Sequence, residues 1–545
     1  MTSSHDSEDG PHRPLLAGSP QQEAYGGAVA AGGRSATPPT PDRLERGGTF
    51  TRNLGALEAF GIVISIVIGS GVFTSPGSID ANVPSPGMAL VTWLVGGVLA
   101  WTGASTLAEL GTAIPGQGGV QPYLQYIFGD VFGFLAAWTW VVAVMPATLA
   151  ILSIVFVESI FSAAGVTDQA GRIEHKLLSV FILVVISVAN SISTKASTRL
   201  NNFFVLTKFV TISAIVLAGI VVVIVQVLSP SRDDVGGRDW FTRPWFGYRK
   251  SVTPGGGEID WNDLGQWEIF GHYSAALYGA LWAYSGWDKA IYISDELSAP
   301  ERQLPLAINS ALPVIIVCFI TSNAAYYILL PWDVVSTTDS VAVTAITRLL
   351  GSAFGILSAV LICLVVAGSL LGNSFVAGRM AVAASHKAWL PGVFGLLGHV
   401  GTRVIYQDAP EDPSDWTRSP KTSRSDAPIN AIILSTILSA LYILFGNFRA
   451  LLTFNGLGEY SFFFLTVLGA IILRYREPGL KRPYKPVLLV PAVFAVVSGF
   501  VVARGAIFAP VQAIVLVLVW ALGLLFYWAR KQWATVRAAR RPHPD

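Results

Sequence analysis

The chain has 545 residues, of which 52% are hydrophobic and only 13% are charged, and its mean hydropathy is +0.56. This is more apolar surface than one soluble core can bury. The composition therefore excludes an ordinary soluble domain and predicts a polytopic, all-α membrane protein embedded in the lipid bilayer. The formal net charge of +2 says little by itself, and we expect no nucleic-acid partner.

The first part of the chain differs in composition from the rest. Residues 1–53 are rich in Gly, Ser, Pro and Ala and hold few large apolar side chains, which is typical of disordered segments. No apolar leader precedes the first long apolar stretch, so we expect no cleaved signal peptide. We interpret residues 1–53 as a disordered N-terminal tail.

Residues 54–528 contain about twelve stretches that approach the ~20 apolar residues needed to cross the hydrocarbon layer. The stretches begin near Ala59, Met88, Gly129, Leu177, Phe203, Phe270, Leu306, Val341, Ile429, Leu451, Val487 and Val511. We therefore predict one membrane domain over residues 54–528 of about twelve transmembrane helices, followed by a C-terminal tail at 529–545.

Lys and Arg gather in alternate loops, for example at residues 379–424 and 474–485. Cytoplasmic loops of membrane proteins carry an excess of these residues, so the pattern places those loops and both termini in the cytoplasm. Because successive loops lie on opposite sides of the membrane, the loop between Leu228 and Glu268 is expected outside the cell. That loop nevertheless holds five basic residues of its own. We expect the chain to lie in the plasma membrane.

Glycine and serine interrupt two of the apolar stretches. The first stretch, from Gly61 to Thr74, contains Gly-Ser-Gly at residues 69–71, and the sixth, from Phe270 to Ile293, contains Tyr-Ser-Gly-Trp at residues 284–287. An unwound stretch near the bilayer midplane leaves backbone N–H and C=O groups free. Secondary transporters bind their solutes at such breaks.

The two breaks offer complementary chemistry. Amide groups that follow the first break begin a half-helix, whose positive end suits a carboxylate. Carbonyl groups that precede Gly286 suit an ammonium group. Together the breaks predict a pocket for a zwitterion, such as an α-amino acid. The alternative for the first break is a close contact between helices through small residues.

The positions of the breaks also predict a topology. A broken stretch leads each of two consecutive sets of five, which is the pattern of a LeuT-type 5+5 inverted repeat. The expected fold is therefore a helical bundle in which helices 1 and 6 are broken.

Several motifs resemble those of L-type amino acid transporters in the amino acid-polyamine-organocation superfamily. The motifs are Ile68-Gly69-Ser70-Gly71-Val72-Phe73, Ala108-Glu109-Leu110-Gly111, Ala283-Tyr284-Ser285-Gly286-Trp287 and Leu473-Arg474-Tyr475-Arg476. The resemblance covers roughly residues 54–527. The long Pro-rich tail and the polar insertions are more similar to the fungal branch, which includes high-affinity methionine permeases.

The resemblance implies which residues contact the substrate. Positions that match those holding the substrate carboxylate are Val67, Ile68, Ser70 and Gly71, and positions that match those facing the amino group are Trp282, Ala283 and Ser285. Trp282 is also similar in position to an aromatic gate, and its alternative interpretation is an ordinary packed aromatic.

Lys208, in the fifth stretch, matches a lysine that the family is expected to place where sodium-coupled relatives hold an ion. A charge inside a span is costly and usually functional. The alternative for Lys208 is a side chain that extends to the inner interface.

Three further residues bear on gating or coupling. Asp288 stands where animal members tend to have a neutral amide, and Glu459 and Tyr460 lie in the tenth stretch near the expected pocket. Carboxylates inside spans serve in proton relays, so these residues suggest coupling to protons. The alternatives are a pair between Asp288 and Lys289 or Lys208, and a bond from Glu459 to a neighbouring hydroxyl group.

Other chemistry has little support in the sequence. The seven histidines show no metal-ligand spacing, and no phosphate-binding Gly-x-x-x-x-Gly-Lys motif occurs. We therefore expect no enzyme activity, no cofactor and no metal ion. Animal L-type members join a heavy chain through a cysteine after the third span. The loop from Phe161 to His175 has none, so we expect no disulfide-linked heavy chain. Glu109 is expected to cap the loop at residues 116–119.

These observations predict a secondary active transporter of neutral L-amino acids, with methionine or another large neutral side chain as substrate. Transport would proceed by alternating access, as proton symport or as exchange. The alternative is an amino-acid-sensing membrane receptor without net transport. A channel is disfavoured, because broken helices that meet at a closed midplane site imply alternating access.

Overall fold

The computed structural model describes residues 54–114, 119–164, 172–192, 194–229, 235–252, 257–338, 341–396, 427–446 and 448–539. The predicted tail at residues 1–53 lies outside these residues, as does the polar insertion from Gln407 to Asp426.

The described chain is almost entirely helical. Its first half contains α1 (Ala56–Val67), α2 (Gly71–Asp80), α3 (Pro86–Ala113), α4 (Val120–Phe128), α5 (Asp130–Thr139), the π-helix η1 (Trp140–Val144), α6 (Met145–Ala163), α7 (Ile173–Ile192), α8 (Thr194–Leu228), α9 (Asp239–Thr242) and the strands β1 (Ser251–Val252) and β2 (Glu258–Ile259). Its second half contains α10 (Gln266–Ala283), the 3₁₀-helix η2 (Trp287–Glu296), α11 (Pro300–Leu329), α12 (Trp332–Thr337), α13 (Val341–Leu350), α14 (Ser352–His386), the 3₁₀-helix η3 (Gly392–Gly395), α15 (Ile429–Phe445), α16 (Phe448–Arg476), α17 (Leu489–Phe508) and α18 (Pro510–Ala539).

The expected type of span is confirmed, whereas the length and hydropathy of the described helices support up to ten spans of the twelve expected. Among the described residues, nine helices are long and apolar enough to cross a membrane, and α1 with α2 forms a tenth span that bends by 44° at its break. The remaining two predicted stretches correspond to α10 with η2 and to α15, an apolar helix of 17 residues. The chain is thus a polytopic, all-α membrane protein whose first and sixth segments are broken.

The eighth predicted stretch begins later than the sequence indicated. Helix α13 ends at Leu350, and Gly351, with a φ of +92°, separates it from α14. Glycine adopts this conformation without steric cost, so the chain can turn and α13 packs against α14. The start predicted near Val341 therefore belongs to a short separate helix, and the eighth span begins at Ser352.

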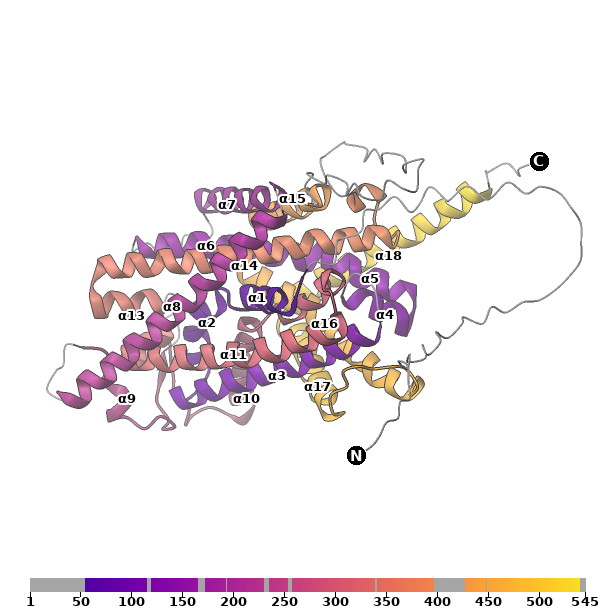
Figure 1. Cartoon of the computed structure of the whole chain (residues 1–545). Helices are drawn as coiled ribbons and strands as arrows, with labels where there is room; N and C mark the ends of the chain where they lie inside the picture. Colours follow the sequence, from indigo (N-terminus) through magenta and orange to yellow (C-terminus); the bar gives the residue numbers. More distant parts are fainter. Residues whose placement is uncertain are drawn as a thin grey trace, which may run out of the picture. The chain divides into compact units, whose positions relative to one another are not determined.

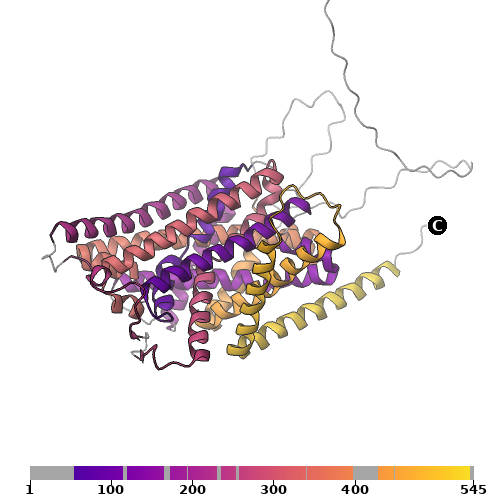
Figure 2. The same ribbon diagram turned by 90° about the horizontal axis from the view of Figure 1, so that it is seen from below.

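The broken first segment lies in the interior of the bundle (Figure 1). Helix α1 packs against α8, α11, α14 and η2, and α2 packs against α10 and α12. Helix α18 instead runs along one side of the bundle, where Figure 2 shows it in yellow, and it packs against α5, α16 and α17. The polar backbone at the breaks is therefore surrounded by protein rather than by lipid, as a membrane requires.

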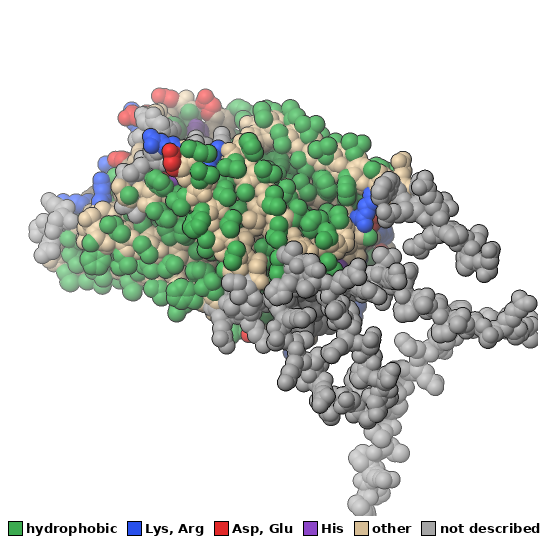
Figure 3. Space-filling model, turned by 90° about the horizontal axis from the view of Figure 1, so that it is seen from above, with side chains coloured by type: hydrophobic (Ala, Val, Ile, Leu, Met, Phe, Trp, Pro, Cys, Tyr) green, Lys and Arg blue, Asp and Glu red, His purple; other side chains and the backbone are tan. Residues whose placement is uncertain are grey.

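The surface of the bundle is apolar over much of its width. In Figure 3 hydrophobic side chains cover the middle of the visible face, and charged side chains gather toward its ends. On α8, Leu217 and Val221 are more than half exposed. Side chains of this kind are costly to expose to water, so this belt is the surface that contacts lipid.

Glycines let α3 approach its neighbours closely. A Cβ atom on Gly103 would lie 2.6 Å from the Phe494 ring and 2.8 Å from Trp287.

We expect Gly103→Ala to destabilise the protein by about 1–3 kcal/mol through overpacking, measured as a lower melting temperature in detergent. Gly271→Ala is the matched control, because a Cβ there has no neighbour within 4 Å. Equal melting temperatures for the two variants would contradict this account of the packing.

Candidate functional site

The first break separates α1 from α2 by three residues. The Ile68 amide still donates to the Ile64 carbonyl at 3.0 Å, and α2 begins at Gly71 with Ser70 as its N-cap. The Ser70 carbonyl accepts hydrogen bonds from the amides three and four residues later, at 2.9 and 3.0 Å. The first amides of α2 have no acceptor within the helix, so they form its positive dipole end.

The second break separates α10 from η2 at residues 284–286. Gly286 has a φ of +104°, a conformation in which other residues are strained, and a Cβ there would lie 2.5 Å from the Ile66 side chain. The Ser285 amide donates to the Trp282 carbonyl at 2.9 Å. Of the three carbonyls predicted to face an ammonium group, that of Trp282 therefore already accepts a hydrogen bond within the protein.

The two breaks touch each other. A Cβ on Gly71 would lie 2.6 Å from the Ala283 Cα atom and 3.1 Å from the Ala283 carbonyl oxygen. The N-terminus of α2 and the C-terminus of α10 thus meet at a point that has no room for a side chain. A cavity of about 50 Å³ lies beside this contact.

Most of the residues predicted to contact a substrate line this cavity. They are Val67, Ser70, Gly71, Trp282, Ala283 and Ser285. Ile68 is fully buried, and in the described structure it is not part of the lining. Its carbonyl instead accepts a hydrogen bond from the Ser369 hydroxyl of α14 at 3.3 Å. The break at Ile68 is therefore directed toward α14 rather than toward the cavity.

Three polar residues of the lining were missed by the sequence analysis. Thr148 of α6 donates to the Asn455 amide oxygen of α16 at 3.0 Å, and Asn373 of α14 donates to the Ser369 carbonyl at 2.9 Å. Each is a polar side chain within an otherwise apolar helix, which is a signal that the sequence did contain.

Lys208 contacts the end of α1 that leads into the first break, and its side chain does not extend to the inner membrane interface. Its side chain is fully buried, and its ammonium group donates to the Ser65 carbonyl of α1 and, at 2.8 Å, to the Ser369 hydroxyl of α14. Ser369 in turn donates to the Ser65 carbonyl at 2.9 Å. Lys208 therefore connects α8, α1 and α14 next to the cavity.

A buried cluster of charges borders the cavity on another side. The Lys289 ammonium donates to both Asp288 carboxylate oxygens, at 2.8 and 3.0 Å, and to Glu459 Oε1 at 3.1 Å. The Ser285 hydroxyl donates to Glu459 Oε2 at 3.0 Å. Asp288 thus pairs with Lys289, one of the partners that the sequence left open, and Glu459 bonds both a hydroxyl group and that lysine. Lys289 and Glu459 line the cavity.

Tyr460 lies one residue beyond the charged cluster. It is buried and lines a second cavity of about 10 Å³, together with Trp282 and Glu459. Trp282, Ser285 and Glu459 line both cavities, and only the larger cavity is lined by residues of the first break.

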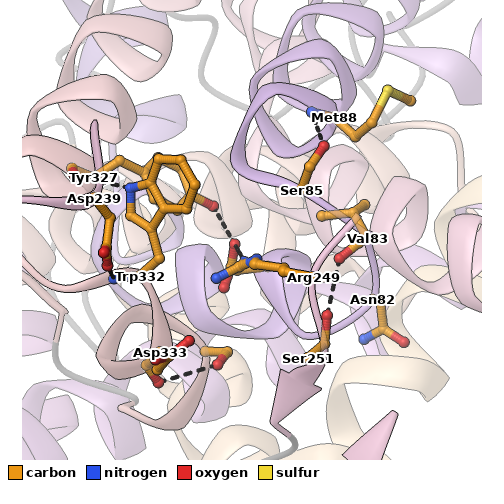
Figure 4. A network of polar contacts seen from close by, with 12 residues as sticks. Asn82, Val83, Ser85, Met88, Asp239, Arg249, Ser251, Tyr327, Trp332 and Asp333 are labelled. Atoms are coloured by element: carbon orange, nitrogen blue, oxygen red, sulfur yellow. Dashed lines mark hydrogen bonds and ion pairs between the residues drawn. The ribbon is translucent and has the colours of Figure 1, made fainter. Parts of the chain in front are cut away.

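The end of α2 is fastened by a network of polar contacts (Figure 4). Asp80, the last residue of α2, is fully buried and accepts hydrogen bonds from the Arg249 guanidinium and from the Tyr327 hydroxyl, the latter at 2.5 Å. Burial lowers the pKa of the Arg249 guanidinium, but Asp80, Tyr327 and Asp333 together raise this pKa by more, so that it lies above its ordinary value. The Ser251 hydroxyl also donates to the Val83 carbonyl at 3.2 Å. The loop between α8 and α10 thus closes over this end of the first segment.

The Glu109 carboxylate of α3 contacts two arginines. Its carboxylate accepts two hydrogen bonds from the Arg474 guanidinium, one of them at 2.9 Å, and lies 3.4 Å from Arg482 Nε. The loop at residues 115–118 is outside the described residues. Glu109 therefore joins α3 to the C-terminal end of α16 and to the segment that follows it.

Comparisons with known proteins agree with this architecture. Residues 54–529 match the sequence profile of a family described as amino acid permease. The b(0,+)-type amino acid transporter 1 of Homo sapiens is 29% identical over 480 residues, which cover 88% of this chain and 88% of that protein. The cystine/glutamate transporter of Homo sapiens is 28% identical, covering 86% of this chain and 82% of that protein. The large neutral amino acids transporter small subunit 2 of Mus musculus is 27% identical, covering 86% and 79%.

The ion pair at the end of α2 generates a prediction for stability. We expect Arg249→Met to cost about 3–5 kcal/mol, because it leaves the buried Asp80 carboxylate without a cation. The loss would be measured as a lower melting temperature in detergent. Lys250→Met is the control: its ammonium is mostly exposed and lies 3.7 Å from Glu258, so we expect a change below about 1 kcal/mol. A comparable loss in both variants would show that Asp80 does not depend on its partner.

Proposed function

This chain belongs to the amino acid permease family, and we propose that it is a secondary active transporter of neutral L-amino acids that works by alternating access. The contact between the two helix breaks carries this proposal. It brings the positive end of α2 and the negative end of α10 to one cavity. Each end is equivalent to about half an elementary charge, with opposite signs. A zwitterion is complementary to that pair of ends.

Each break would bind one of the two charged groups of the substrate. The first amides of α2, at Ser70 and Gly71, would hold the carboxylate, and the carbonyls of Ala283 and Ser285 would accept hydrogen bonds from the ammonium group. Val67 and Trp282 would shape the same site through their side chains. Ile68 would act through its backbone and not through its buried side chain.

The rest of the lining favours a large neutral side chain. Ile66, Ile151 and Leu152 add apolar surface to the cavity beside Trp282. Such surface suits leucine or the flexible thioether of methionine. One relative is named for large neutral amino acids, which agrees with this choice. The similarity of the Pro-rich tail to the fungal methionine permeases favours methionine among these substrates.

The size of the cavity bears on the transport cycle. The cavity measures about 50 Å³, and in an alternating-access cycle it would widen toward one side of the membrane at a time. Trp282 lines both cavities beside the charged cluster and would act as a gate when α10 moves. Through its hydrogen bonds, Lys208 would keep α1 attached to α8 and α14 during that movement.

The proposal extends to topology and partners. The membrane domain at residues 54–528 would lie in the plasma membrane with both tails in the cytoplasm. The Asp80 network would then close the outer end of the site, and Glu109 with Arg474 would close the inner end. Since the segment from Phe161 to His175 contains no cysteine, the chain would work without a disulfide-linked heavy chain. Movement of substrate could be driven by protons or by exchange.

Uptake into proteoliposomes tests this proposal. We expect saturable uptake of labelled methionine and leucine by the native chain, and at least a tenfold lower uptake for Gly71→Ala, because the added methyl collides with the Ala283 backbone. Gly61→Ala is the matched control in α1, since a Cβ there has no neighbour within 4 Å.

Two results would contradict the proposal. Saturable binding of methionine without any flux would favour an amino-acid-sensing receptor. Equal uptake by the Gly71 and Gly61 variants would show that the contact between the breaks is not part of the transport site.

A further inference from the structure

We propose that Asp288, Lys289 and Glu459 form a proton-binding site, so that one proton crosses the membrane with each amino acid. This inference rests on the transport function proposed above and names the ion that would drive it. It depends on the geometry of the cluster, on its charge count and on its place between two elements that must move. The proton would enter from outside, reside on the carboxylate pair and leave to the cytoplasm.

The geometry makes the two carboxylates share one ammonium group. Lys289 contacts Asp288 at 2.8 and 3.0 Å and Glu459 at 3.1 Å. The exposed fraction of each of the three side chains is 3% or less. The cluster is therefore removed from solvent, and its charges must be balanced by the protein itself.

The charge count leaves the cluster with one negative charge in excess. Within the described part of the chain, Lys289 is the single cation that pairs with either carboxylate. An uncompensated charge in a buried site is strongly unfavourable. A single proton, held by either carboxylate, makes the cluster neutral without any other change.

The neighbouring groups do not supply the missing positive charge. Among the described residues, the titratable groups that surround the cluster are Tyr278 of α10, Tyr292 of η2 and Tyr460 of α16. A tyrosine side chain carries no positive charge in any state. Arg504 of α17 lies 5.8 Å from the centroid of the Tyr278 ring, and its Nε atom donates to the Ser274 hydroxyl at 2.8 Å. Thr148 of α6 and Asn373 of α14 face the same cavity and do not titrate.

The location of the cluster connects protonation to movement. Asp288 and Lys289 lie in η2, directly after the second break, whereas Glu459 lies in α16. Ser285, which lies within the break, donates to Glu459 at 3.0 Å. Any displacement of the sixth segment against α16 would therefore change the contacts of Glu459 with both of its donors. The cavity gives the cluster a path to solvent when the site opens, because Lys289 and Glu459 line it.

The cluster is distinct from Lys208 as a candidate for coupling. Lys208 donates to a carbonyl and to a hydroxyl group, and neither acceptor titrates in the physiological range. The shared lysine at Asp288 and Glu459 instead provides two exchangeable carboxyl sites. Variants of the two carboxylates therefore test this inference without altering Lys208.

The test uses the full chain in proteoliposomes that contain a pH-sensitive dye. For the native protein we expect added methionine to acidify the lumen, and an inward proton gradient to raise methionine uptake at least tenfold. Glu459→Gln and Asp288→Asn each leave one carboxylate opposite Lys289, which is neutral without a proton. In both variants the ratio of uptake with the gradient to uptake without it should fall to about one, whatever the residual rate. Asp263→Asn, an exposed acid in the loop before α10, is the control and should keep the native ratio.

A second measurement covers variants that are too slow to assay by uptake. Calorimetric titration of the purified chain with methionine, in buffers of different ionisation enthalpy, counts the protons taken up on binding. We expect uptake of protons by the native chain and none by Glu459→Gln. An unchanged proton count in Glu459→Gln and Asp288→Asn would overturn the inference. Saturable uptake by the native chain that does not depend on the proton gradient and does not acidify the lumen would also overturn the inference. The proposed transport function would not be affected by that result. Absence of any flux would instead refute the transport function itself.

Discussion

The contact between the two helix breaks is the constraint on which the rest of the structure depends. Gly71 lies against the Ala283 backbone, and Gly286 lies against Ile66. Both contacts are too close to leave room for a Cβ atom on the glycine. Because the helices stop at this contact, dipole ends of opposite sign face one cavity. A membrane interior supplies no water to the freed backbone groups, so surrounding side chains must bind them. Ser369 and Lys208 do this for the end of α1.

Buried charges lie at three levels along the bundle, and each level joins elements that are distant in sequence. Asp80 binds Arg249 at the end of α2, and Glu109 binds Arg474 at the opposite end of the chain's spans. The charged cluster of Asp288, Lys289 and Glu459 lies beside the cavity between them. A buried charge without its partner is strongly destabilising. In the proposed transport cycle, opening either end of the site would require these charged pairs to separate or to move together.

Local patterns predicted the elements well, because the signals act over short distances. The breaks expected at residues 69–71 and 284–287 are found at residues 68–70 and 284–286. The error at Val341 has a local cause as well. Helix α13 is as apolar as a span, and only the backbone conformation of Gly351 shows that the chain turns before α14. The short strands and α9 in the loop before α10 have no comparable signal, since they are held by contacts with the bundle, such as that of Ser251 with Val83.

The sequence by itself determined that the chain is a broken-helix membrane protein and where its helices break, because the length of an apolar run and a glycine-serine interruption are properties of neighbouring residues. Only the tertiary structure decided how the polar side chains combine. Asp80 and Arg249 are 169 positions apart, and Lys289 and Glu459 are 170 positions apart. The sequence could offer Asp288 two partners and Glu459 only an unnamed hydroxyl group. Which groups meet depends on the packing of whole helices, and that packing is set by close approaches such as those at Gly71 and Gly103 rather than by any local pattern.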